Sequence, residues 1–316
     1  MLKFYKTIDG VTKEIENPEV GCWISAVAPT EDEKNYLIQT IGVLPEFVRA
    51  SLDAEESSHI DFDDDENQTL VIIDYPSDEE KGDDLYEQNT LQYTTLPLGV
   101  VLMKGYIVTM CLYENRNIDD MANGVVKGVN TDMKTRFLLL LLLRISQRYL
   151  IYLRQIDRLS SLTEMRLHKS MRNEELIQML GLEKSLVYFS TSLKTDEITL
   201  NKIMRGKVIK LYEEDQELLE DVLIEIHQAI EMCNIYSGIL SGTMDAFASV
   251  ISNNLNIVMK VLTVITIVMA IPNIIFSFYG MNVNGLPIPE WWFPTLIAIV
   301  ACMIATYIFK KKDMFH

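Results

Sequence analysis

The sequence has few cysteines and histidines, and they stand apart from one another. The four cysteines form no CxxC pair and have no neighbouring histidine, so the common zinc and disulfide patterns are excluded; they are Cys22, Cys111, Cys233 and Cys302. The chain also lacks a GxxxxGK[ST] motif, a GxGxxG motif after a strand, and any recognisable nucleophile, base and orienting group. We therefore predict neither an enzyme nor a nucleotide-driven pump, and expect reduced, mostly buried cysteines.

Positive charge is scarce as well. The 316 residues contain 28 Lys and Arg against 45 Asp and Glu, a net charge of −17, and only two of the acidic residues follow position 255. Nucleic-acid binding needs a basic surface, so that class is excluded. The acidic run DFDDDEN at 61–67 resembles a calcium loop, but Glu66 and Ile72 stand where that loop needs Gly and Glu. We predict a charged turn there.

Residues 1–130 have the pattern of an α/β domain. Four runs rich in β-branched and aromatic residues predict strands; they are 21–29, 69–76, 95–103 and 106–113. Thr30 and Glu33 have the spacing of a capping box, which predicts a helix start. Residues 131–209 predict a helical hairpin. Its RFLLLLLLR segment is far shorter than the ~20 residues that span a bilayer, so we expect a buried helix.

Residues 210–279 predict one very long helix. Apolar residues recur at spacings of three and four without a proline over roughly eleven turns; they are Leu219, Val222, Ile226, Ala229, Cys233, Tyr236, Leu240, Met244, Phe247, Ile251, Leu255 and Val258. A helix of this length with one apolar edge needs partners alongside it. We therefore expect parallel copies from other subunits.

Two segments, 257–278 and 291–309, are long and apolar enough to cross a bilayer. The loop 280–290 between them has no positive charge, whereas the tail 310–316 begins with three lysines. The positive-inside rule then places both termini in the cytoplasm and the loop outside. The first ten residues lack the apolar run of a signal peptide. We expect a multi-pass protein of the plasma membrane.

The first membrane segment carries a stripe of polar and small side chains. At about 100° per residue they share an arc of roughly 100°; they are Asn256, Met259, Thr263, Thr266, Ala270, Asn273 and Ser277. Such a stripe serves either as a helix-packing face or as the wall of a water-filled pore. The asparagines favour the pore, because amide oxygens suit the water shell of a cation. A stripe without a carboxylate would hold that ion weakly, as conduction requires.

The segment NNLNIVMKVLTVITIVMAIPNIIFSFYGMN, followed by PEWW, a second apolar span and KKK, resembles the CorA-type magnesium transporters. The resemblance is close over 241–312. It implies an α/β cytoplasmic domain, a long helical stalk and two C-terminal transmembrane helices, assembled as a homopentameric funnel-shaped channel. It implies Mg²⁺ as substrate and regulatory ligand, Co²⁺ or Ni²⁺ as surrogates, the lipid bilayer as environment, and no cofactor.

The same resemblance implies roles for individual residues. Asn282 would form a selectivity ring that binds the ion's water shell, held in shape by Gly280 and Met281, and Glu290 would recruit cations in the outer loop. Asn256, Met259 and Leu262 match the narrow inner gate. Three residues in the middle of the pore depart from the family pattern; they are Ala270, Asn273 and Pro272, the last displaced by one place.

Feedback by cytoplasmic Mg²⁺ is also implied by the resemblance. Asp221 and Asp245 match acidic positions of the family, whereas the acidic position on the α/β domain falls on Ala50. Nearby carboxylates that could replace it are Asp53, Glu55 and Glu56. Two alternatives stay open: a zinc-transporting, ZntB-like member of the same fold, and a membrane-anchored cation sensor that conducts nothing.

Overall fold

The computed structural model describes residues 1–78, 92–170, 173–206, 208–281, 288 and 290–312. It divides into two compact units, residues 1–241 and 242–316. One helix, α6 (Glu213–Tyr279), continues through the boundary between them.

A seven-stranded mixed sheet forms the centre of the first unit. Its strands are β1 (Leu2–Ile8), β2 (Val11–Ile15), β3 (Cys22–Val27), β4 (His59–Asp63), β5 (Gln68–Ser77), β6 (Thr94–Met103) and β7 (Tyr106–Cys111). They lie in the order β2-β1-β3-β7-β6-β5-β4, with β3 and β7 parallel and every other pair antiparallel. The four strands predicted from the sequence are confirmed.

Three further strands, β1, β2 and β4, lie outside the four strands predicted from the sequence. Asp9 (φ 53°) and Gly10 (φ 77°) join β1 to β2, and two consecutive positive φ angles are typical of the tight hairpin turn that Asp-Gly favours. The prediction of a charged turn over 61–67 is wrong in part, because Asp61 and Asp63 lie on β4 and the turn covers only 64–67. β4 is an edge strand, where acidic side chains discourage pairing with another chain.

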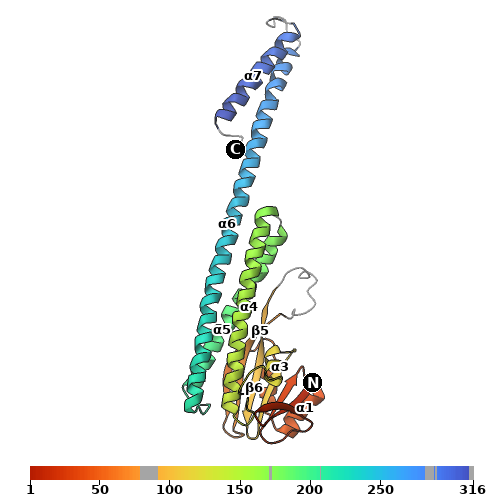
Figure 1. Cartoon of the computed structure of the whole chain (residues 1–316). Coiled ribbons are helices and arrows are strands. Elements are labelled where there is room, and N and C mark those ends of the chain that lie inside the picture. Colours follow the sequence, from red (N-terminus) through yellow and green to blue (C-terminus); the bar gives the residue numbers. More distant parts are fainter. Residues whose placement is uncertain (79–91, 171–172, 207, 282–287, 289, 313–316) are drawn as a thin grey trace. The chain divides into compact units, whose positions relative to one another are not determined.

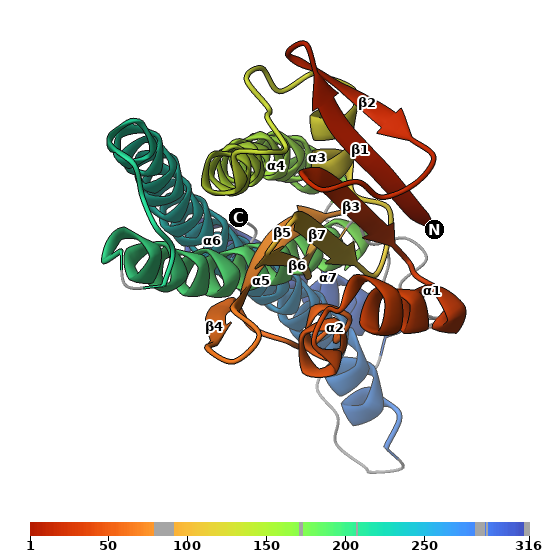
Figure 2. The same cartoon turned by 90° about the horizontal axis from the view of Figure 1, so that it is seen from below.

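Helices cover both faces of this sheet (Figure 2). On one face lie the short helices α1 (Glu31–Tyr36), η1 (Leu37–Ile41) and α2 (Pro45–Ser51). The predicted capping box is confirmed, since Glu33 N donates to Thr30 Oγ1 at 3.3 Å and Thr30 N donates to Glu33 Oε2 at 2.9 Å. At Gly99 of β6, an added Cβ would lie 1.9 Å from Ser51 Oγ, so only glycine lets α2 pack this closely.

On the other face lie α4 (Lys134–Ser170) and α5 (Asn173–Met204). The apolar run of α4 is buried as predicted, and Phe137 packs against Trp23 of β3 with ring centroids 5.0 Å apart. α5 presents polar side chains to the sheet: Ser185 Oγ accepts from Tyr93 N at 2.8 Å, and Ser192 Oγ donates to Thr95 Oγ1 at 2.8 Å. These bonds satisfy polar groups that burial removes from water.

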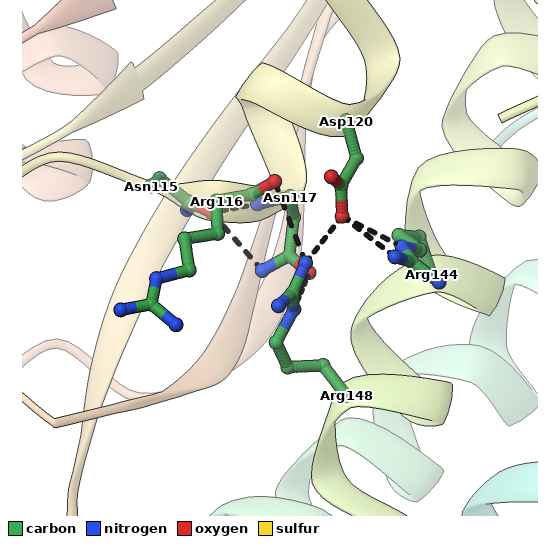
Figure 3. A network of polar contacts seen from close by, with 6 residues as sticks. All are labelled: Asn115, Arg116, Asn117, Asp120, Arg144 and Arg148. Carbon is green, nitrogen blue, oxygen red and sulfur yellow. Dashed lines mark hydrogen bonds and ion pairs between the residues drawn. The ribbon is translucent and has the colours of Figure 1, made fainter. Parts of the chain in front are cut away.

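The short helix α3 (Arg116–Ala122) is tied to α4 by a network of charged and amide groups (Figure 3). Arg144 Nε donates to Asp120 Oδ2 at 2.9 Å, and Arg148 binds the same oxygen. Arg148 Nε also donates to Asn117 Oδ1 at 3.1 Å. Burial lowers the pKa of the Arg148 guanidinium, although the Asp120 carboxylate opposes that shift. Two guanidiniums converge on one carboxylate, which fixes α3 against α4.

Candidate ion pathway

The second unit contains the end of α6 and the helix α7 (Trp292–Lys311). Among the described residues, α6 and α7 are the two helices long and apolar enough to cross a bilayer. They contain the predicted spans 257–278 and 291–309 almost entirely. α7 returns alongside the last turns of α6 (Figure 1), and Tyr279 contacts Phe293 with ring centroids 6.3 Å apart.

One side of α6 is partly covered in this unit. Most of the covered residues recur every three or four positions; these are Ile257, Val261, Val264, Val268, Ile271, Ile275 and Tyr279, and Ala270 and Pro272 are half-buried as well. Val264 is only 1% exposed, and on α7 Ala298 is 4% exposed. α7 therefore packs on an apolar face of α6.

The polar stripe lies on roughly the opposite side of α6, at about 100° per residue. Asn256, Thr263, Thr266, Asn273 and Ser277 are all exposed in the single chain, as are Met259 and Leu262, while Ala270 is half-buried. Polar side chains facing lipid are unfavourable. The stripe therefore needs water or protein beyond the described residues of one chain.

Two threonines of the stripe have a defined hydrogen-bond direction. Thr263 Oγ1 donates to Met259 O at 2.7 Å, and Thr266 Oγ1 donates to Leu262 O at 2.8 Å. Since each hydroxyl proton points back to its own helix, the oxygen lone pairs remain free to accept from outside. A wall of such acceptors suits the water molecules around a cation.

The outer end of α6 is built around Gly280. Gly280 N donates to Phe276 O at 2.9 Å, and an added Cβ would lie 3.2 Å from the same oxygen, so a larger residue would crowd this last turn. Met281 is exposed, and so is Glu290, whose carbonyl accepts from Phe293 N at 3.1 Å. The predicted filter residue Asn282 lies outside the described residues.

The candidate regulatory carboxylates stand apart in the chain. Asp53 and Asp221 are exposed residues of the first unit, and Asp245 is an exposed residue of the second. Asp53 Oδ1 accepts from Glu55 N at 3.0 Å, which shapes the loop before β4. Within the described ranges, no three His, Cys, Asp or Glu side chains come close enough together to hold a metal ion.

A polar cavity of about 240 Å³ lies beside the α3–α4 network. Its walls come from the end of β5, the start of α3 and the middle of α4, and include Asp78, Arg116 and Arg148. Both arginines already contact carboxylates, Arg116 with Asp78 at 3.5 Å and Arg148 with Asp120. This cavity has no local signal in the sequence, because its walls come from segments far apart in the chain.

Comparison with known proteins identifies relatives along nearly the whole chain. The model of the family described as CorA-like Mg2+ transporter protein matches residues 18–311. A cobalt/magnesium transport protein CorA from Methanocaldococcus jannaschii is 28% identical over 303 residues, covering 92% of this chain and 90% of its own.

Solved structures with a similar fold include a full-length CorA transporter and a ZntB domain. The complete structure of the CorA magnesium transporter from Methanocaldococcus jannaschii has a TM-score of 0.84 at 25% identity, covering 99% of this chain and 98% of its own. The cytoplasmic domain of ZntB from Vibrio parahaemolyticus has a TM-score of 0.60 at 10% identity, covering 79% of this chain and 98% of its own. At that identity the second likeness concerns the fold alone.

Proposed function

The chain belongs to the CorA-like Mg2+ transporter family, and on that premise we propose that it conducts hydrated Mg²⁺ through a pore lined by α6 of five identical subunits. The observation that carries the proposal is the polar stripe of α6, which is exposed on the side away from α7. Copies of α6 around an axis would enclose that stripe and give it water. Lipid would then contact α7 and the remaining apolar sides.

The proposed driving force is the membrane potential. Each elementary charge gains about 2.3 kcal/mol per 100 mV, so a divalent cation gains roughly twice that amount. In the proposed orientation, with both termini in the cytoplasm, Lys310, Lys311 and Lys312 stay on the inner side and the loop with Glu290 faces outward. Negative charge at the outer mouth raises the local cation concentration, and a loop of lysines would oppose it.

The proposed selectivity filter is a ring of Asn282 side chains. Mg²⁺ gives up its water slowly and prefers six oxygens in an octahedron, so neutral amide oxygens bind its water shell without removing it. The tight turn at Gly280 supports this assignment, because it fixes where the chain leaves α6 immediately before Asn282.

Ion flux into proteoliposomes tests both the transport and the filter. We expect Mg²⁺ influx with the parent protein under an inside-negative potential, and a loss of about tenfold or more in Asn282→Ala, since several hydrogen bonds of about 1 kcal/mol each are removed. Asn284→Ala, a second asparagine in the same loop, is the matched control and should keep the parent's flux. Equal flux in parent and Asn282→Ala would remove the filter assignment, and no flux in the parent would favour a non-conducting sensor.

Zinc transport is the second proposal for the same pore. Its only support is the similar fold of the ZntB domain. The matching family model and the 28% identical relative are both named for magnesium transport. Competition between Mg²⁺ and Zn²⁺ in the same liposomes distinguishes the two. Flux of Zn²⁺ that excess Mg²⁺ does not reduce would support the zinc-transporting alternative.

We further propose that Mg²⁺ on the inner side closes the pore by bridging carboxylates of neighbouring subunits. Asp221 supports this, since it is exposed on α6 and free to face another chain. Asp53 is the proposed partner on the α/β unit, and Asp245 is a second candidate near the membrane segment. A bridging cation would neutralise carboxylates that otherwise repel one another.

Charge reversal tests this feedback. In Asp221→Lys we expect internal Mg²⁺ to inhibit influx at a concentration at least about tenfold higher than in the parent, because a lysine repels the bridging cation. Glu220→Lys makes the same charge change at the adjacent exposed position of α6 and serves as control. Unchanged inhibition in Asp221→Lys would place the sensor elsewhere.

A further inference from the structure

Pro272 interrupts the hydrogen bonding of the proposed pore helix. It lies inside α6, between the stripe residues Ala270 and Asn273. Proline has no N–H, so the carbonyl four residues earlier, that of Val268, loses its normal donor. An unsatisfied carbonyl is strongly unfavourable in the hydrocarbon region, so a group on a neighbouring helix commonly replaces the lost donor.

A thiol of the neighbouring helix supplies a donor at this position. Cys302 Sγ of α7 donates to Val268 O at 3.6 Å, a normal separation for a weak S–H···O hydrogen bond. Cys302 is half-buried against α6. Hydroxyls elsewhere on these two helices behave differently: Thr266 and Thr306 donate to carbonyls of their own helix. The thiol reaches across to α6 at the turn where a carbonyl has lost its partner.

The sequence of α7 explains how the thiol comes so close. Ala298, Cys302 and Ala305 follow one another at spacings of four and three, and all three lie on the side that faces α6. Small residues in such a row let two membrane helices approach closely. The side chain of Cys302 is just long enough to reach the backbone of the opposite helix and short enough to leave the approach undisturbed.

We propose that Cys302 is a positioning residue for ion transport. Its thiol holds the Pro272 turn of α6 against α7. This contact fixes how the stripe residues after the proline, Asn273 and Ser277, are oriented relative to those before it, Thr263 and Thr266. Helices bend most readily at proline, so without this contact the two halves of the stripe would lose their common alignment. This inference rests on the proposed pore, although the contact itself does not depend on it.

A double-mutant cycle on flux tests the inference. Cys302→Ala removes the donor and should lower Mg²⁺ influx about threefold, the effect of a typical interhelical hydrogen bond in a membrane. Cys302→Ser should not restore the flux, because its hydroxyl is too short to reach Val268 O and hydroxyls on these helices donate to their own helix. Pro272→Ala restores the N–H for Val268 O, so adding Cys302→Ala in that background should change flux no further. An equal loss in both backgrounds would overturn the proposal, since it would mean that Cys302 acts through its volume.

A second measurement does not depend on transport. The infrared S–H stretching band of Cys302 is identified by its loss in Cys302→Ala. In the parent protein in lipid, this band should lie at the frequency of a hydrogen-bonded thiol. A band at the position of a free thiol would overturn the proposal even if every variant changed flux. If the parent showed no flux at all, the proposed function would fail, while the band would still decide whether Cys302 binds the Val268 carbonyl.

Discussion

Two helices of this chain carry a polar face, and their surroundings are opposite. On α5 the polar side chains Ser185, Ser192 and Asp196 are buried and bond to the sheet. On α6 the stripe around Thr266 and Asn273 is exposed in the single chain. The first set is satisfied by its own fold and has a structural role. In the second set, Thr263 and Thr266 donate to carbonyls of their own helix and the side chains stay exposed, so the role of the stripe depends on what other copies and solvent supply.

The largest expected effect comes from making the exposed stripe apolar. In the double variant Thr266→Val with Asn273→Leu, we expect Mg²⁺ flux in proteoliposomes to fall by at least about tenfold, because a narrow apolar lining excludes water. Both side chains are exposed, so the fold of the single chain should be unaffected.

Thr306→Val is the matched control for that variant. Thr306 is also exposed and also donates to a carbonyl of its own helix, Cys302 O at 2.8 Å, but it lies on α7. It should retain the parent's flux. Full flux in the α6 double variant would show that the stripe is a packing face, as the polar side of α5 is.

The sequence carried much of the fold because its signals are local. The capping box at Thr30, the buried run of α4 and the two apolar spans follow from composition and spacing, and the structure places helices or strands there. β1, β2 and β4 were missed because their apolar residues are interrupted by charges, as suits strands at or near an edge of the sheet.

The candidate pathway was predictable only in part. Periodicity defined the stripe of α6, but it could not tell which side α7 covers, and that depends on the row Ala298, Cys302 and Ala305. The contact of Cys302 with Val268 joins residues 34 positions apart and has no local signal. The buried polar face of α5 has no local signal either. Asp196 bonds to Asp74 of β5 and to Ser58, which directly precedes β4, and both residues lie far from it in the sequence.

The smaller expected effect concerns Asp196, the one carboxyl on the buried side of α5. Its Oδ1 accepts from Ser58 Oγ at 2.5 Å and from Asp74 N at 3.0 Å, while Oδ2 has no hydrogen-bond partner among the described residues. Burial, and then the neighbouring Asp74 carboxylate, raise the pKa of Asp196 well above its usual range, and the hydrogen bonds from Ser58 and from the Asp74 amide only partly oppose this. The folded environment therefore favours the neutral, protonated form of Asp196.

A raised pKa in the folded state has a definite consequence for stability. The stabilisation is fully present below the unfolded pKa, about 3.9, and is lost as pH rises towards the folded pKa, by up to about 1.4 kcal/mol per pH unit.

We expect Asp196→Asn, which has no proton to lose, to remove that slope. Hydrogen exchange in β5, corrected for the intrinsic effect of pH, should increase less between pH 4 and pH 6 in the variant than in the parent, because the slope begins at the unfolded pKa. Asp120→Asn is the control with the opposite environment, because Asp120 is paired with Arg144 and Arg148, and it should destabilise the chain without removing the slope. The same slope in parent and Asp196→Asn would mean that Asp196 is ionised in the folded chain, and the buried side of α5 would then hold an unpaired charge.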